Sequence, residues 1–331
     1  NRRRKNVMRD DMWMKSAGEK IARELGAEIT AFLDDESVTE IMLNQDGTVW
    51  IDRMGEGMSR TGVVMARERA MLVIGSVAAY KHTTVNEKKP LLSANLPGGQ
   101  RFQAMIEPVT TAPVFSIRCG RKVVLDLLDY VPERMTERIY RLLQKAVSER
   151  RNIIVSGGTG SGKTTLSSAL LAEIGRLCPD DRIAVMEDTP ELQIVNRNAV
   201  FERITDNACA SALLAANLRM RPDRIILGET RGAEAMELLK AWNTGHPGGI
   251  CTIHANSATS ALSRLETLIL ESNISGMTLP FIRSLIADAV NLVVHVQKDR
   301  RIGPVVSEVL EVSGLDINGA YRTSVVEKRK D

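Results

Sequence analysis

The stretch VSGGTGSGKTT, residues 155–165, places four glycines and one lysine between two segments of regular pattern. The apolar run before it, residues 152–156, has the composition of a buried strand, and residues 166–176 after it have helical periodicity. The pattern G-x-x-x-x-G-K-(S/T) is met by Gly157, Gly162, Lys163 and Thr164. The stretch therefore predicts a strand, a glycine-rich loop and a helix in direct succession, which is the context that this motif requires.

A loop of this kind binds phosphate, because its glycines let backbone N–H groups turn inward and the following helix adds the positive end of its dipole. In the usual arrangement the lysine reaches the β- and γ-phosphates, and the hydroxyl of Thr164 takes a position on Mg²⁺. We therefore expect this Walker A loop to hold ATP with Mg²⁺. The expected binding residues are Gly157, Gly158, Thr159, Gly160, Ser161, Gly162, Lys163, Thr164 and Thr165.

The rest of the C-terminal half alternates apolar runs with helical segments. The runs are RIAVMED, RIILGE, GICTI and VNLVVHV, at residues 182–188, 224–229, 249–253 and 290–296. Such alternation is typical of a mainly parallel sheet with helices on both faces. The expected fold class is α/β, with a C-terminal RecA-like P-loop domain.

The N-terminal half reads as a smaller α+β domain. Helical patterns cover residues 11–33 and 66–81, and short strand patterns broken by glycine and proline lie around them. Because 331 residues exceed the size at which one core stops growing, two domains are expected. The predicted boundaries are residues 1–121 for the N-terminal domain, 122–132 for a linker and 133–331 for the ATPase domain.

Composition sets limits on the class of protein. With 44% hydrophobic residues, 26% charged residues and a net charge of +3, the chain gives no argument for nucleic-acid binding. The sequence contains no apolar run long enough to span a membrane, which favours a cytoplasmic location. The basic cluster NRRRK, residues 1–5, fits either a solvated tail or a contact with an anionic membrane surface. The four cysteines have no metal-ligand spacing.

Carboxylates follow two of the expected strands. A P-loop enzyme needs one carboxylate on the magnesium side and one group that orients or deprotonates water, each at the end of a neighbouring strand. Glu187 and Asp188 end the first run after the loop, and Glu229 ends the next. One such residue alone fits a solvated strand end, but two in strand order favour a catalytic site.

Two of the four histidines flank one strand, in the segment TGHPGGICTIHANS. His254 lies beside polar residues, which favours a role in sensing phosphate. His246 fits such a role and a structural role equally well. A metal site is not expected here, because no third ligand accompanies the two histidines at a useful spacing.

Four segments together resemble the conserved boxes of the traffic ATPases of the secretion superfamily. They are GGTGSGKTT, MEDTPEL, LRMRPDRIILGETRG and TGHPGGICTIHANS, which match the Walker A, Asp, Walker B and His boxes in order. The segments VTEIMLNQDGTVWIDRMG and LPGGQRFQAMIEPVTTAPVFSIR resemble the N-terminal domain of the type IV secretion and conjugation branch. The whole chain is similar to conjugal-transfer ATPases of the TrbB type.

The resemblance implies roles for single residues. Lys163 would bind phosphate, Thr164 and Glu229 would serve the Mg²⁺ side, and Glu187 would activate water. His254 would contact the γ-phosphate region. Arg101 and Arg118 match arginines of the N-terminal domain that reach the nucleotide phosphates in this family.

The resemblance also implies an assembly and a place in the cell. It implies a homohexamer on the cytoplasmic face of the inner membrane, in peripheral contact with it, that acts with type IV secretion components in bacterial conjugation. A type IV pilus or type II secretion motor, and a nucleotide-gated docking ring with little turnover, remain alternatives. A DNA-translocating motor ranks below them, and no sequence-specific nucleic-acid binding is expected, because the chain has no basic, aromatic-interleaved patch.

Overall fold

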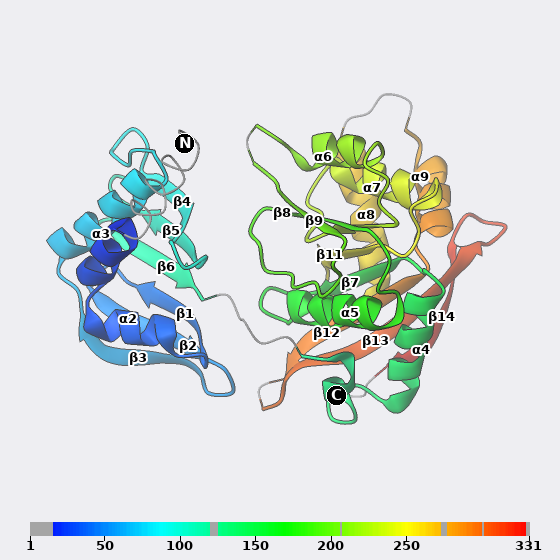
Figure 1. Cartoon of the computed structure of the whole chain (residues 1–331), viewed down its shortest axis with the longest axis horizontal. Coiled ribbons are helices and arrows are strands. Elements are labelled where there is room, and N and C mark those ends of the chain that lie inside the picture. The colour runs from blue at the N-terminus through cyan, green and yellow to red at the C-terminus, as the bar shows by residue number, and fades with distance from the viewer. Residues whose placement is uncertain (1–15, 120–124, 206, 273–276, 300, 329–331) are drawn as a thin grey trace. The chain divides into compact units, whose positions relative to one another are not determined.

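The computed structural model describes residues 16–119, 125–205, 207–272, 277–299 and 301–328. The chain divides into two compact units, Asn1–Lys122 and Val123–Asp331, each with its own sheet (Figure 1). The basic cluster at residues 1–5 and the first residues of the helix expected from residue 11 lie outside the described residues.

The boundary between the units differs from the expected linker of residues 122–132. Residues 125–132 belong to the C-terminal unit, because the 3-10 turn η1 (Leu127–Tyr130) places Leu127 and Tyr130 in the core of that unit. The remaining part of the expected linker, residues 122–124, lies outside the described residues. Apolar side chains in this segment therefore have a packing role that its proline and charges concealed.

The N-terminal unit is a six-stranded antiparallel sheet in the order β3-β2-β1-β6-β5-β4. Along β5 buried and exposed residues alternate, as expected for a sheet with one covered face. A helix at residues 16–25 and two further helices supply apolar side chains to the same core. The elements are α2 (Ala27–Asp34), β1 (Val38–Leu43), β2 (Thr48–Arg53), β3 (Gly57–Val64), α3 (Arg67–Tyr80), β4 (Leu91–Asn95), β5 (Arg101–Met105) and β6 (Val114–Arg118).

The expected helix over residues 11–33 is interrupted in the structure. Gly26 has φ +90° and separates the helix at residues 16–25 from α2. An L-residue with a side chain rarely adopts this conformation, so the glycine ends the first helix and lets the chain start the next.

The C-terminal unit is an eight-stranded sheet in the order β14-β13-β12-β7-β11-β10-β8-β9. The six strands from β12 to β9 are parallel, and β13 and β14 extend the sheet in antiparallel fashion. The strands are β7 (Ile153–Gly157), β8 (Ile183–Glu187), β9 (Ala199–Arg203), β10 (Arg224–Leu227), β11 (Ile250–His254), β12 (Leu292–Asp299), β13 (Gly303–Leu315) and β14 (Tyr321–Lys328). The expected α/β class and mainly parallel sheet are confirmed.

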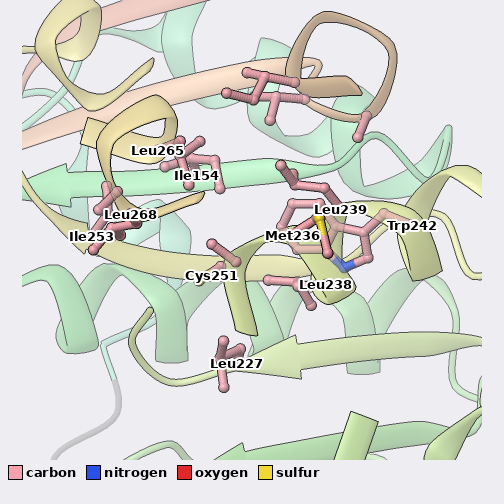
Figure 2. Packing of buried hydrophobic residues seen from close by; sticks show 14 of the residues in the cluster. Ile154, Leu227, Met236, Leu238, Leu239, Trp242, Cys251, Ile253, Leu265 and Leu268 are labelled. Carbon is pink, nitrogen blue, oxygen red and sulfur yellow. The ribbon is translucent and has the colours of Figure 1, made fainter. Parts of the chain in front are cut away.

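Helices cover both faces of this sheet. On one face α4 and α5 pack with Ile153 and Val155 of β7, and on the other α6 to α9 pack with Ile154. Figure 2 shows part of the second cluster, including Trp242 of α7 and Cys251 of β11. The helices are α4 (Glu137–Ser148), α5 (Lys163–Leu177), α6 (Ala210–Asn217), α7 (Glu234–Asn243), α8 (Ala258–Glu271) and α9 (Leu279–Ala289).

A buried charged network holds the amino edge of the parallel sheet. Arg224, the first residue of β10, has a side chain only 1% exposed, and its Nε donates to Asp181 Oδ2 at 2.7 Å. Its Nη groups donate to the carbonyl oxygens of Val147 at 3.0 Å and Gly248 at 3.2 Å. These partners precede β7, β8 and β11, so one guanidinium ties the starts of four neighbouring strands together.

Removing this guanidinium would leave the carboxylate of Asp181 buried with less compensation. We expect Arg224→Ala to lower the free energy of unfolding by about 3–5 kcal/mol, because the buried Asp181 carboxylate loses one of its two guanidinium partners and keeps only Arg150. Arg141→Ala, which removes an arginine 76% exposed in a pair with Glu137, should cost less than about 1 kcal/mol. Urea unfolding of both variants measures this, and equal losses would contradict the assigned role.

Candidate nucleotide site

The glycine-rich loop joins β7 to α5 and is held in place by close packing. Gly162, the residue before α5, has φ +99° in the left-handed region, and a Cβ there would overlap Pro304 of β13. The residue that precedes α5 is this glycine, which has no side chain to cap the helix, and the N-terminal end of a helix favours an anion. The strand, loop and helix predicted around residues 157–165 are present in that order.

Lys163 directs its ammonium group back into this loop. Its side chain is largely buried, and Nζ donates to the carbonyl oxygens of Gly157 at 3.1 Å and Gly158 at 2.8 Å. The same nitrogen lies 3.3 Å from Nδ1 of His254, the last residue of β11. An ammonium group has only donors, so Nδ1 of His254 must be the acceptor and the ring proton must reside on Nε2.

The imidazole of His254 also contacts a carboxylate. His254 Nε2 lies 2.9 Å from Oε1 of Glu229, which stands two residues beyond the end of β10. The strands β7, β11 and β10 are parallel neighbours, so their carboxyl ends meet at one edge of the sheet. The structure therefore brings the predicted residues Lys163, His254 and Glu229 into one hydrogen-bonded chain.

Arg231 extends the chain and was not among the residues predicted from the sequence. Its guanidinium lies 2.8 Å from Oε2 of Glu229 and 3.0 Å from Oδ2 of Asp188, at the end of β8. Arg231 thereby links the carboxylates that follow two neighbouring strands. Arg231 lies within the segment LRMRPDRIILGETRG that resembles the Walker B box, but nothing in that segment singled it out from a surface arginine.

Glu187 has a different environment from Glu229. It is the last residue of β8, is 7% exposed, and accepts hydrogen bonds from the backbone N–H groups of Glu191 and Leu192, both at 3.1 Å. Burial raises the pKa of Glu187 to about 7, while the two backbone hydrogen bonds oppose that shift. A Cβ on Gly228 would come 2.9 Å from Glu187 Cγ, so the glycine makes room for this carboxylate.

A cleft of about 530 Å³ opens beside the loop. It is lined by Gly158 and Thr159 of the loop, by His254 and Asn256, and by the polar face of α8 that carries Arg264. The cleft thus borders the loop at Gly158 and Thr159 and reaches His254 at the end of β11.

The other predicted residues fall in three places. Thr164 and Thr165 stand in the first turn of α5. His246 precedes β11 at the opposite edge of the sheet from His254, and its Nδ1 contacts the carbonyl oxygen of Pro222 at 2.8 Å, so it does not join the chain of Lys163, His254 and Glu229. Arg101 and Arg118 lie in the N-terminal unit, directly opposite each other on β5 and β6.

Two findings about the described residues bear on metals and membranes. Within the described ranges, no group of three or more His, Cys, Asp or Glu side chains is placed to hold a metal ion by itself. Among the helices that the structure describes, none has both the length and the apolar composition needed to cross a bilayer.

A glycine-rich loop at the carboxyl edge of a parallel sheet, with carboxylates and a histidine at the neighbouring strand ends, defines a P-loop α/β protein. The family of type II/IV secretion system proteins matches residues 23–313, and the chain belongs to that family. This confirms the resemblance found in the four boxes.

Two individual relatives are similar to this chain over most of its length. The chain is 43% identical to the conjugal transfer protein TrbB of Rhizobium radiobacter, over 92% of both chains. It is 31% identical to the type IV secretion system protein VirB11 of Bartonella quintana, over 82% of this chain and 87% of that protein.

Two solved structures share the fold at 17% identity. The ATPase DotB of Yersinia pseudotuberculosis has a TM-score of 0.64, with 86% of this chain and 78% of that chain covered. The pilus retraction motor PilT with bound ADP has a TM-score of 0.60, with 91% and 83% covered.

The packing of the loop can be tested without a ligand. Gly160→Ala places a side chain at φ +68° with open space around it, so it should cost about 1–2 kcal/mol of unfolding free energy. Gly162→Ala adds the overlap with Pro304 and should cost about 1–3 kcal/mol more. Urea unfolding of the pair decides the point, and equal costs would show that Pro304 does not restrict the loop.

Proposed function

We propose that this protein is a hexameric, Mg²⁺-dependent ATPase that powers conjugative DNA transfer, pilus assembly and substrate export through a type IV secretion system. The observation that supports this most strongly is the chain from Lys163 through His254 to Glu229, at the edge of the sheet that carries the phosphate loop. The transfer and secretion parts of the proposal follow from the TrbB and VirB11 relatives.

In this proposal the loop residues bind the nucleotide phosphates through backbone N–H groups, and Lys163 provides the charge that pairs with the β- and γ-phosphates. Thr164 and Glu229 would hold Mg²⁺, which neutralises phosphate charge when bound. Two protein oxygens suffice, because Mg²⁺ usually completes its shell with water and substrate phosphates. His254 reports on the γ-phosphate side through its contacts with Lys163 and Glu229.

Glu187 is the proposed base that activates the attacking water. A carboxylate with a pKa near neutrality suits this role, because a general base works best when its pKa lies close to the operating pH. Its two hydrogen bonds to loop backbone fix the position of the carboxylate, so little reorganisation is needed when water is bound.

The proposals on assembly and on cellular location rest on the family assignment alone. We propose a homohexamer at the cytoplasmic face of the inner membrane, working with the membrane components of the secretion apparatus. Arg101 and Arg118 are proposed to act on the nucleotide phosphates, where a guanidinium can bind oxygen atoms bidentately. Their positions opposite each other on β5 and β6 would let the two act on one phosphate group.

Replacing the loop lysine tests the proposal most simply. Lys163→Ala should abolish ATP binding and lower hydrolysis by at least about a hundredfold, because a charge placed for the transferred phosphate is lost. Lys145→Ala removes a lysine 67% exposed on α4 and should leave both unchanged. Steady-state hydrolysis and nucleotide titration, with particle mass measured alongside, give the result.

Two outcomes of that experiment would contradict the proposal. Hydrolysis of ATP by Lys163→Ala at the wild-type rate would show that the assignment of the nucleotide site is wrong. Tight binding of ATP by the wild-type protein without turnover at any protein concentration would instead favour a nucleotide-gated docking ring.

The pKa of Glu187 leads to a pH prediction. The base acts only when it is deprotonated, so kcat/KM should rise with pH through about 7 and level off above it. Between pH 6 and pH 8 the deprotonated fraction grows from about 10% to about 90%, which gives roughly a tenfold rise. Glu187→Gln should bind ATP, lose this dependence and hydrolyse at least about a hundredfold more slowly. Hydrolysis of ATP by Glu187→Gln at the wild-type rate would show that another group is the base, and Glu229 would be the first candidate.

A further inference from the structure

A row of polar side chains crosses the sheet beneath the phosphate loop. Ser156 on β7 is paired in register with His295 on β12, His295 with Glu308 on β13, and Glu308 with Lys328 on β14. Residues paired in this way lie on the same face of a sheet. The row interrupts a face that is otherwise apolar, since Ile154, Val293 and Leu310 all belong to its hydrophobic core.

His295 is hydrogen-bonded to the strand that ends in the loop. Its Nδ1 lies 2.9 Å from Oγ of Ser156, and both side chains are buried. Burial lowers the pKa of His295 below its ordinary value, and the nearby charge of Lys163 lowers it further, although Glu308 opposes the shift. A neutral imidazole therefore makes this contact at neutral pH, one residue before Gly157.

Glu308 connects the same row to the start of α8. Its buried carboxylate accepts a hydrogen bond from the backbone N–H of Ala258 through Oε2 at 2.9 Å, and Oε1 lies 3.7 Å from Lys328 Nζ. The negative charge of this carboxylate also interacts favourably with the positive end of the α8 dipole. Ala258 follows His254 by one short loop, so Glu308 fixes the far end of the segment that carries that histidine.

The two strands β12 and β13 touch the loop directly as well. A Cβ on Gly157 would overlap the carbonyl oxygen of Val296, the residue after His295, and a Cβ on Gly162 would overlap Pro304. The hairpin of β12 and β13 therefore borders the loop at both of its ends. The segment of His254 is fixed by the same hairpin through Glu308.

From this arrangement we infer that His295 is a positioning residue for the nucleotide site. Its bond to Ser156 holds the end of β7 against β12, and Glu308 holds the start of α8 on the same hairpin. Together they set the separation between Lys163 and His254. The inference rests on the proposed function for its kinetic consequence, but its structural consequence can be measured without nucleotide.

The test compares three variants of the full chain. His295→Leu removes the bond to Ser156, whereas His295→Asn keeps an amide near the position of Nδ1 and should restore it. Val293→Ala removes apolar bulk from the same face of β12, two residues away, and controls for a general loss of stability. Hydrogen exchange of backbone amides is measured without nucleotide, and kcat and KM for ATP are measured with it.

For His295→Leu we expect amide exchange in residues 157–165 and 255–258 to become at least about tenfold faster. KM for ATP should rise by about tenfold or more, because the phosphate-binding groups are displaced. His295→Asn should behave like wild type. Val293→Ala should lower stability without changing KM, since a smaller folded fraction reduces apparent kcat alone.

Unchanged exchange and KM in His295→Leu, or equal changes in Val293→Ala, would overturn the inference. Should His295→Leu fail to fold, Ser156→Ala removes the other partner of the bond and must show the same faster exchange, or the inference falls. A wild-type protein that does not hydrolyse ATP would refute the proposed function alone, since the exchange measurement would still decide the role of His295.

Discussion

The placement of one ammonium group organises the site. Lys163 Nζ lies among the carbonyl oxygens of Gly157 and Gly158 and the Nδ1 of His254, so the loop, the start of α5 and the end of β11 all meet at one charge. Because the ammonium can only donate, it fixes the tautomer of His254 and so directs Nε2 to Glu229. A nucleotide phosphate would compete for the same ammonium group, which would make the chain of contacts sensitive to occupancy.

The rest of the C-terminal unit makes this arrangement possible. At the amino edge of the sheet, the buried guanidinium of Arg224 holds the strand starts, while at the carboxyl edge the polar groups are gathered at the loop. Close contacts at Gly157 and Gly162 leave the loop little room to shift against the β12–β13 hairpin. A rigid scaffold of this kind keeps charged groups in position before a ligand arrives, which is how electrostatic preorganisation arises.

Much of this could be predicted from the sequence, because the informative signals were local. The glycine pattern located the loop, and the apolar runs placed Glu187, Glu229 and His254 at strand ends. Contacts between distant segments carried no such signal. In the sequence Arg231 looks like a surface residue, because its pairs with Asp188 and Glu229 form only where β8 and β10 are neighbours. Glu308 lies within a strand that contains polar residues, so a search for apolar runs did not find it. The interruption at Gly26 was missed because helical periodicity continues across it.

The state of His254 offers the most direct test of the account. The imidazole nitrogens of the four histidines can be followed by nitrogen NMR, with His254→Asn used to assign the signals. In the nucleotide-free protein the account predicts an unprotonated Nδ1 and a protonated Nε2 for His254, and a change in the Nδ1 signal when ATP with Mg²⁺ draws Lys163 toward phosphate. A proton on Nδ1 in the nucleotide-free protein, or signals that nucleotide leaves unchanged, would contradict it.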